Sequence, residues 1–415
     1  MSQKNNPYAA FQMPEFRLYC ATRFFITMAL SLPPVLLGWR LYELTHDELV
    51  LGNVFLAEVI PALAISLFAG HFVDLADKRK LLLTCFGGYL LYAIALLGAT
   101  SDWATDHIGQ QSVIYAVYGI IFYGGVISAF SGPVGFAMMP QLVPRDLLVN
   151  ASSWSSTSWQ VGSIVGPAIA GWSYSWIGIS WSLSLMLAFV LVGIVCIYRI
   201  SAKPPAHTQK DGETIWQSLS IGLNFVFRTK EVLAALSLDM FAVLFGGAVA
   251  LLPVFAKTIL QAGPEGLGLL RSAPAIGTCL TLIAMAYFPI GKNPGVKLLV
   301  AVFGFGVSMI VFGLSKNIYL SFGCLFASGM LDGVSVNIRR NILQLKTPHE
   351  MRGRVASVNS MFIGSSNELG GYESGLTARL MGAVPAVVMG GCLTLGVVVA
   401  TWFSAPALRA MELEE

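Results

Sequence analysis

The chain has 415 residues, of which 55% are hydrophobic and only 11% are charged, and its formal net charge at pH 7 is +3. Soluble domains carry about 25% charged residues, so this composition excludes a protein that meets water over most of its surface. The small net charge says little by itself, and we expect no nucleic-acid partner.

Apolar runs recur along the whole chain, and each is long enough to cross a bilayer, because about 20 helical residues span a hydrocarbon core of about 30 Å. They predict an all-α membrane protein of twelve transmembrane helices, over residues 17–41, 51–73, 81–100, 112–139, 151–172, 175–198, 232–257, 266–290, 296–314, 318–338, 355–382 and 384–405. A soluble helical core would not need so many long, nearly uncharged runs.

The lysines and arginines are distributed unevenly between the two sides of these spans. Most of the 25 fall in segments on the same side as the N-terminus, including Arg339 and Arg340 after the span 318–338. Because cytoplasmic loops are enriched in these residues, we predict an inner (cytoplasmic) membrane protein with both termini in the cytoplasm. The six cysteines stand singly in apolar runs, so we expect no metal, no cofactor and no disulfide.

A polar, proline-containing stretch, "SAKPPAHTQKDGET" (201–214), divides the chain into halves of six spans each. The segment "PQLVPRDLLVNAS" (140–152) precedes the fifth span, and the similar "LQLKTPHEMRGRVAS" (343–357) precedes the eleventh. Such a repeat is typical of transporters built from duplicated bundles. We therefore predict an N-terminal six-helix bundle at 1–200, a cytoplasmic linker at 201–230 and a C-terminal bundle at 231–415.

The loop after the second span reads "GHFVDLADKRK" (70–80). It resembles the signature loop of the major facilitator superfamily, and the resemblance extends over the chain through span number, duplication and charge bias. In that family the loop forms an inner gate, which implies a gate motif of Gly70, Asp74, Lys78 and Arg79. Leu75 replaces the usual arginine, and Asp77 (the loop's other departure) replaces the usual glycine.

The fifth span contains "GSIVGPAIAG" (162–171), which resembles the glycine-proline motif of proton-coupled exporters in the same superfamily. Its residues Gly162, Gly166, Pro167 and Gly171 predict a bent helix with a flat face that packs against a helix of the other half. The sequence "QLKTPHEMRGRVASVN" looks most like the enterobactin-exporter and macrolide-efflux branch. The fourth span lacks the buried arginine that many drug-proton antiporters carry.

Several acids fall inside predicted spans, where ionised carboxylates are costly and usually functional. They are the proton-coupling candidates Glu58, Glu368, Glu373, Asp239 and Asp332. Counting along the helices places Glu58 and Glu373 at similar depth, so the two could meet and share a proton. The alternatives are that Glu373 pairs with Arg379, that Asp332 is hydrated, and that Glu58 only caps the outer mouth.

Other polar and aromatic side chains lie on helices that the resemblance assigns to the central cavity. The substrate-cavity candidates are Arg23, Phe122, Tyr123, Trp159, Gln160 and Phe241. Arg23 would serve as a substrate or counter-charge residue, and the aromatic rings would stack on a large amphipathic molecule. Aromatic residues are also common as lipid-facing anchors.

We therefore expect a monomeric secondary transporter that works by alternating access and exports a bulky, drug- or siderophore-like small molecule in exchange for protons. Its partners would be this substrate, protons and the lipid bilayer. An importer or facilitator of a nutrient or metal chelate and a transporter-like sensor stay open as alternatives. Because no catalytic motif or P-loop is present in the sequence, we do not expect an enzyme.

Overall fold

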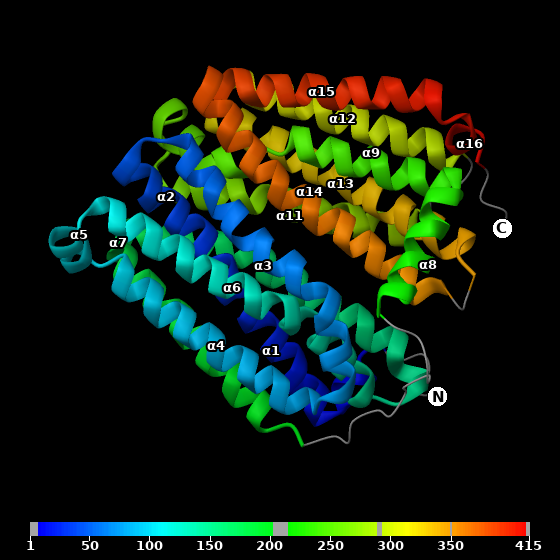
Figure 1. The fold of residues 1–415 in the computed structure, drawn as a ribbon, viewed down its shortest axis with the longest axis horizontal. Helices are drawn as coiled ribbons and strands as arrows, with labels where there is room; N and C mark the ends of the chain where they lie inside the picture. The colour runs from blue at the N-terminus through cyan, green and yellow to red at the C-terminus, as the bar shows by residue number, and fades with distance from the viewer. Residues whose placement is uncertain (1–6, 202–214, 289–292, 349–350, 412–415) are drawn as a thin grey trace. The chain divides into compact units, whose positions relative to one another are not determined.

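The computed structural model of the chain describes residues 7–201, 215–288, 293–348 and 351–411, with backbone alone for 66–71, 74–75, 102, 105, 215–219, 286 and 352–353. Every regular element in these ranges is helical (Figure 1), which confirms the predicted all-α fold. The elements of more than four residues are α1 (Pro14–Ser31), α2 (Pro33–Thr45), α3 (Glu48–Leu75), α4 (Lys78–Ala99), α5 (Asp102–Ile108), α6 (Gln110–Met138), α7 (Leu148–Tyr198), α8 (Ile215–Arg228), α9 (Lys230–Gly246), the π-helix Phe255–Ile259, α11 (Gly263–Tyr287), α12 (Pro294–Leu314), α13 (Ile318–Lys346), α14 (Arg352–Met381) and α15 (Ala383–Ser404). The short helices α10 (Leu252–Val254) and α16 (Pro406–Arg409) complete the α-helices.

Ten segments of the described chain are long and apolar enough to cross a membrane. One of them, Arg145–Tyr198, has 54 residues. A straight helix of that length would measure about 80 Å, far more than the thickness of a bilayer core. Helix α14 is not among the ten, so the number of twelve crossings stays a prediction.

Helix α7 is interrupted at Gly178, whose φ of 74° and ψ of 176° are not helical. A positive φ of this kind favours glycine, because a side chain would be strained there. In the first arm of α7, a Cβ at Gly162 would lie 2.9 Å from the Cβ of Thr27, and one at Gly166 would lie 2.6 Å from that of Ser31. This arm therefore runs parallel to α1. The predicted packing of these glycines against a helix of the other half is wrong, since their partner is α1.

The second arm of α7 runs the opposite way along α1. A Cβ at Gly193 would lie 2.7 Å from the side chain of Ile26. Further on, the backbone N–H of Ser201 donates a 3.0 Å hydrogen bond to Glu15, near the start of α1. The chain thus turns back at Gly178 without a loop, and the predicted spans 151–172 and 175–198 are the two arms of one interrupted helix.

The helices pack into two compact units. Unit 1 comprises Met1–Leu44 and Ala57–Asp211, and unit 2 comprises Thr45–Leu56 and Gly212–Glu415. Unit 1 thus holds α1, α2, most of α3 and α4–α7, while unit 2 holds the first part of α3 and α8–α16.

The first part of α3 belongs to unit 2 because it lies directly on α14. A Cβ at Gly375 would be 2.6 Å from the Cα of Gly52, so the two backbones touch where both residues are glycine. Directly before the start of α3, Asp47 Oδ2 lies 3.3 Å from Arg379 Nη1 of α14.

Helix α8 lies within the stretch predicted as a linker. Its Val226 is fully buried in the apolar core of unit 2, together with residues of α9, α12, α13 and α14. A Cβ at Gly222 would be 3.0 Å from the carbonyl oxygen of Arg354, so α8 contacts the start of α14 closely. The ribbon of α8 runs crosswise to that of α9 (Figure 1).

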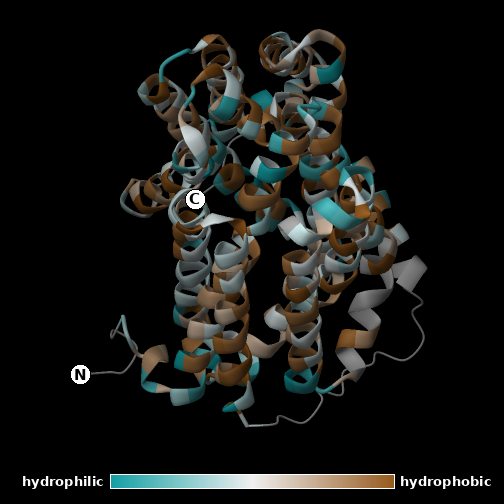
Figure 2. Ribbon diagram, turned by 90° about the vertical axis from the view of Figure 1, so that its left-hand side faces the viewer, coloured by the Kyte–Doolittle hydropathy of each residue, from teal (hydrophilic) through white to brown (hydrophobic). Residues whose placement is uncertain are grey.

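Large apolar side chains are widely exposed on the helices. Trp172, Trp176 and Trp181, on both sides of the turn at Gly178, are 57%, 70% and 70% exposed. Figure 2 shows apolar residues along the helices and several hydrophilic ones at helix ends. Exposed apolar surface of this extent is expected where lipid replaces water, and tryptophan is favoured at the boundary between them.

Candidate functional site

The described part of unit 2 contains a buried group of charged and hydroxyl side chains, which we call the unit 2 polar cluster: Asp239, Asp332, Ser335 and Arg339. Asp239 comes from α9, and the other three come from α13. Their spacing of three and four residues places all three on one face of α13, because a helix turns once in 3.6 residues.

Asp239 and Arg339 form the ion pair at the centre of this cluster. Arg339 Nη1 lies 2.5 Å from Asp239 Oδ2, and the two side chains are only 5% and 7% exposed. The Nε of Arg339 and the hydroxyl of Ser335 are both buried and have no hydrogen-bond partner. The pair is therefore shielded from water, yet donors remain beside it that one more oxygen atom could satisfy.

Asp332 brings a second carboxylate to the cluster. It lies close enough to Asp239 and Arg339 for electrostatic interaction. Within the described residues, however, no lysine or arginine nitrogen lies within 4.0 Å of the Asp332 carboxylate, so Asp332 forms no ion pair there. Two carboxylates and one guanidinium carry a net charge of −1, so a single proton would make the cluster neutral.

A small pocket opens between α9, α12 and α13 at these side chains. Asp239, Asp332 and Ser335 line it together with apolar residues, among them Phe305. It has room for about one water molecule. A site for a bulky substrate needs a far larger volume, so this pocket suits a proton or a water molecule and not the transported compound.

In unit 1, Arg23 lies on α1 beside α6 and α7. Its Nη1 atom is 3.6 Å from the position that a Cβ at Gly135 would take. Tyr19, one turn before it, donates a 2.9 Å hydrogen bond to the carbonyl oxygen of Gly135. Tyr19 also interacts through its hydroxyl with Arg23 and with Ser155 of α7. The structure thus gives Arg23 a neutral, hydroxyl-rich surrounding.

The other predicted acids occupy separate places. Glu58, in unit 1, is near enough to Tyr89 and Tyr92 of α4 for electrostatic interaction. Glu373, in unit 2, accepts a 2.7 Å hydrogen bond from Thr377 of its own helix.

Arg379, the alternative partner of Glu373, pairs with Asp47 instead. Glu368 is partly buried on α14. The predicted approach of Glu58 to Glu373 joins residues of different units, and it stays a prediction.

The aromatic cavity candidates are partly exposed. Phe122 and Trp159 are 45% and 47% exposed, while the Tyr123 hydroxyl lies against Gly88 of α4. Phe241 stacks on Phe245, with ring centroids 6.3 Å apart.

Two residues along a helix correspond to about 200° of rotation, so Phe241 faces away from Asp239 and the unit 2 polar cluster. Gln160 is partly buried on α7. Their roles at a substrate site stay predictions.

The gate motif is only partly described. Gly70 and Asp74 lie in α3, but their side chains are outside the described residues, so the predicted aspartate latch is not tested. Lys78 Nζ donates hydrogen bonds to the carbonyl oxygens of Val73 and, at 3.1 Å, Ala76.

Arg79 bonds the carbonyl oxygens of Ile197 (3.4 Å) and Tyr198 (2.5 Å). Both basic side chains thus cap helix ends, where carbonyl groups lack partners and the helix dipole favours a cation.

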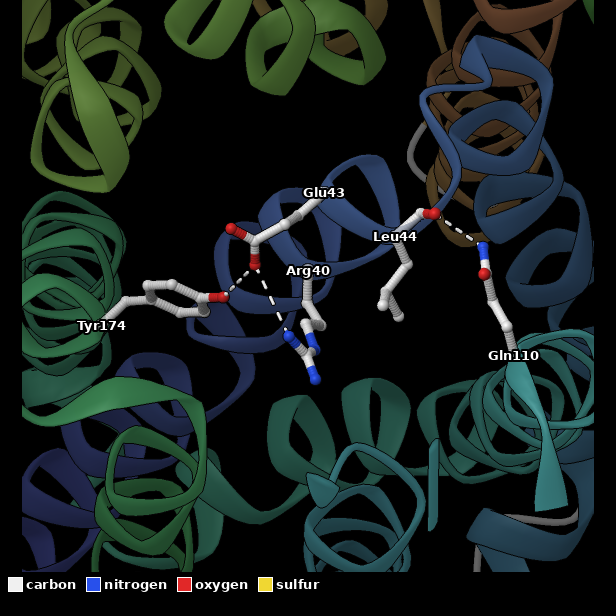
Figure 3. A network of polar contacts seen from close by, with 5 residues as sticks. All are labelled: Arg40, Glu43, Leu44, Gln110 and Tyr174. Carbon is white, nitrogen blue, oxygen red and sulfur yellow. Dashed lines mark hydrogen bonds and ion pairs between the residues drawn. The ribbon is translucent and has the colours of Figure 1, made fainter. Parts of the chain in front are cut away.

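A second polar network lies in unit 1 (Figure 3). Tyr174 of α7 donates a 3.0 Å hydrogen bond to Glu43, and Arg40 lies 3.6 Å from the same carboxylate oxygen. Nearby, Gln110 donates a 2.6 Å bond to the carbonyl oxygen of Leu44. The network ties the end of α2 to α6 and α7, which is a structural role.

Arg339 and Ser335 were not among the predicted site residues. The predicted span ended at residue 338, which left Arg339 outside the membrane segment, but α13 continues to Lys346 and Arg339 is 4% exposed. The helix thus extends eight residues beyond the predicted span. The spacing of Asp332, Ser335 and Arg339 was the sequence signal that could have revealed their common face.

Apolar helices in two compact units, with a buried charge cluster and a water-sized pocket, define a multi-pass membrane transport protein. Residues 19–371 match the model of the family described as Major Facilitator Superfamily. The chain belongs to the major facilitator superfamily, as the sequence predicts, and it is a transporter and not an enzyme.

The chain is similar to enterobactin exporter EntS of Shigella boydii serotype 4 (strain Sb227), with 24% identity over 349 residues that cover 82% of this chain and 80% of the relative. The same values hold for enterobactin exporter EntS of Escherichia coli O1:K1 / APEC. These matches confirm the predicted branch.

Among solved structures, a POT family transporter in complex with 5-aminolevulinic acid has a TM-score of 0.74 at 11% identity, covering 95% of this chain and 96% of that one. Nucleoside transporter NupG has a TM-score of 0.67 at 14% identity, covering 95% and 98%. At such identities these two structures show the fold alone.

Proposed function

We propose that the chain is a secondary active exporter that works by alternating access and moves a bulky, drug- or siderophore-like molecule out of the cell in exchange for protons. The observation that carries proton coupling is the unit 2 polar cluster. It holds one more carboxylate than cation, and its pocket admits little more than a water molecule.

The cluster can act as a proton site because its charge changes with one proton. With Asp239 and Asp332 both ionised it carries −1, and with one of them protonated it is neutral. Charge inside the membrane is costly, so the two forms favour different surroundings of the cluster. A transporter that cycles between two states can use this difference to couple proton movement to export.

Export of a siderophore-like compound is supported by the relatives, whose printed names describe enterobactin exporters. The glycine-proline motif at Gly166 and Pro167 is typical of exporters, and here Gly166 packs α7 closely against α1. We further propose location in the inner membrane as a monomer with both termini in the cytoplasm. The proposed bundles are 1–200 and 231–415, and within the connecting stretch 201–230 helix α8 packs on the second bundle.

The decisive experiment uses inside-out vesicles that contain the purified chain and have an acidic lumen. The wild-type protein should accumulate enterobactin when the proton gradient is present and lose this accumulation when the gradient is collapsed. In the Asp332→Asn variant, gradient-driven accumulation should be about tenfold or more below that of the wild type. Exchange of labelled for unlabelled enterobactin should be retained.

The matched control is Glu231→Gln, which removes an acid of unit 2 in the first turn of α9, in a partly exposed ion pair with Lys346. It should transport like the wild type. Unchanged gradient-driven accumulation by Asp332→Asn would contradict the proton site. Accumulation that needs no proton gradient in the wild type would contradict coupling, and accumulation only in right-side-out vesicles would contradict export.

A further inference from the structure

Arg23 differs from three other helical arginines, Arg40, Arg339 and Arg379. Arg40, Arg339 and Arg379 each have an aspartate or glutamate within 4.0 Å. No carboxylate of the described residues lies that close to Arg23. Carboxylates therefore balance the charges of Arg40, Arg339 and Arg379, whereas no carboxylate balances the charge of Arg23.

The position of Arg23 makes this imbalance costly. The span Pro14–Thr45 has 32 residues, and Arg23 lies about 10 Å along the axis from its mid-point. The hydrocarbon core extends about 15 Å to each side of the bilayer centre, so this cation lies at the depth of the lipid chains. Arginine at such depth usually faces a partner or a water-filled cavity.

The groups around Arg23 are donors or neutral. Its Nε is buried and has no hydrogen-bond partner. Tyr19 and Ser155 contribute hydroxyl groups, and the Gly135 carbonyl already accepts the Tyr19 proton. Ser158 of α7, one turn after Ser155, adds a third hydroxyl near the neighbouring Cys20. This set lacks a negative charge. The Tyr19 and Ser158 hydroxyls already donate their protons to the carbonyl oxygens of Gly135 and Trp154, so the positive charge and the unpaired Nε of Arg23 are what remain for an anionic oxygen.

We infer that Arg23 binds an anionic group of the transported molecule, such as a carboxylate or another acidic oxygen. This inference rests on the proposed transport function and deepens it by naming the class of substrate. Gly135 of α6 lies beside the guanidinium, and a Cβ there would be in ordinary van der Waals contact with Nη1 at 3.6 Å. Molecules whose only charge is positive would be repelled from the site.

The test measures binding at equilibrium to the full chain in nanodiscs, with no proton gradient. The probes are the fluorescent acid 1-pyrenebutyrate and its uncharged methyl ester. The wild type should bind the acid at least about tenfold more tightly than the ester, because a hydrogen bond to a charged group is worth more than a neutral one. Arg23→Gln should abolish this preference and leave the affinity for the ester unchanged.

Two matched variants complete the design. Arg23→Lys keeps the charge and should retain part of the preference, while Arg17→Gln removes an exposed arginine of the same helix and should behave like the wild type. Equal affinities for acid and ester in the wild type, binding of neither, or an unchanged preference in Arg23→Gln would each overturn the inference.

A lipid phosphate is also an anionic oxygen ligand, like the acid group of a substrate. The choice of nanodisc lipid distinguishes the two. The acid should bind equally in phosphatidylcholine alone and with added phosphatidylglycerol. If phosphatidylglycerol displaces the acid, Arg23 is a lipid site and the substrate assignment is overturned. Because no gradient is used, this result is independent of whether Asp332→Asn uncouples transport.

Discussion

Replacing Asp239 with alanine should destabilise unit 2 strongly. The change leaves Arg339 buried, at 4% exposure, without the carboxylate that now lies 2.5 Å away. Asp332 is beyond ion-pair distance from Arg339, so it cannot take the place of the Asp239 carboxylate unless the helices repack. Removing one partner of a buried ion pair costs about 3–5 kcal/mol, which corresponds to a fall in Tm of about 6–20 °C for a unit of this size.

The assay is thermal unfolding of the detergent-purified protein, followed by intrinsic fluorescence. Combining Asp239→Ala with Arg339→Met removes both charges and should restore most of the lost Tm, since the uncompensated cation is gone. The control is Glu231→Ala, whose pair with Lys346 at 3.6 Å is partly exposed and worth at most about 1 kcal/mol. If Asp239→Ala lowers Tm no more than this control, or if the double variant shows simple additivity, the account of the cluster fails.

Three further changes test the packing and the helix ends. Gly329→Val should reduce the yield of folded protein severely, because a Cβ there would lie 2.0 Å from the carbonyl oxygen of Pro274. Its control is Gly323→Ala on the same helix, where the space is open, and thermal unfolding should show a shift in Tm of less than about 3 °C. Arg79→Ala should lower Tm by about 1–4 °C through loss of the cap on the last carbonyls of α7, and a Tm equal to that of the wild type would refute the capping role. Trp154→Phe removes the 2.8 Å indole hydrogen bond to the N-terminal segment and should speed proteolytic cleavage before α1, which mass spectrometry of a time course would detect.

The helical class and most helix positions could be predicted because lipid imposes a simple rule on sequence: a crossing needs a long apolar run. Boundaries were harder to place where polar residues continue a helix, as in α13 beyond residue 338. The span 355–382 was found despite its polar residues, and α14 covers Arg352–Met381. In both cases hydropathy alone does not say where backbone hydrogen bonding ends.

The candidate site could be predicted only one residue at a time. Asp239 and Asp332 were recognisable because acids are rare inside spans, but Arg339, the ion-pair partner of Asp239, was taken for a topological signal. The helix that packs against Gly162 was assigned to the wrong half of the chain. A row of small residues predicts that another helix approaches closely, but it does not predict which helix. Pairings between distant segments depend on how helices pack, which local pattern does not encode.

The glycine turn inside α7 has a practical consequence for anyone mapping this protein in cells. Because a single residue joins the two arms, no exposed hydrophilic connection is available there for a reporter fusion or an epitope tag. Inserted sequence at Gly178 would force the arms apart and give a misleading readout of sidedness. Chemical labelling of single cysteines placed at the neighbouring exposed tryptophans, Trp176 and Trp181, avoids this problem.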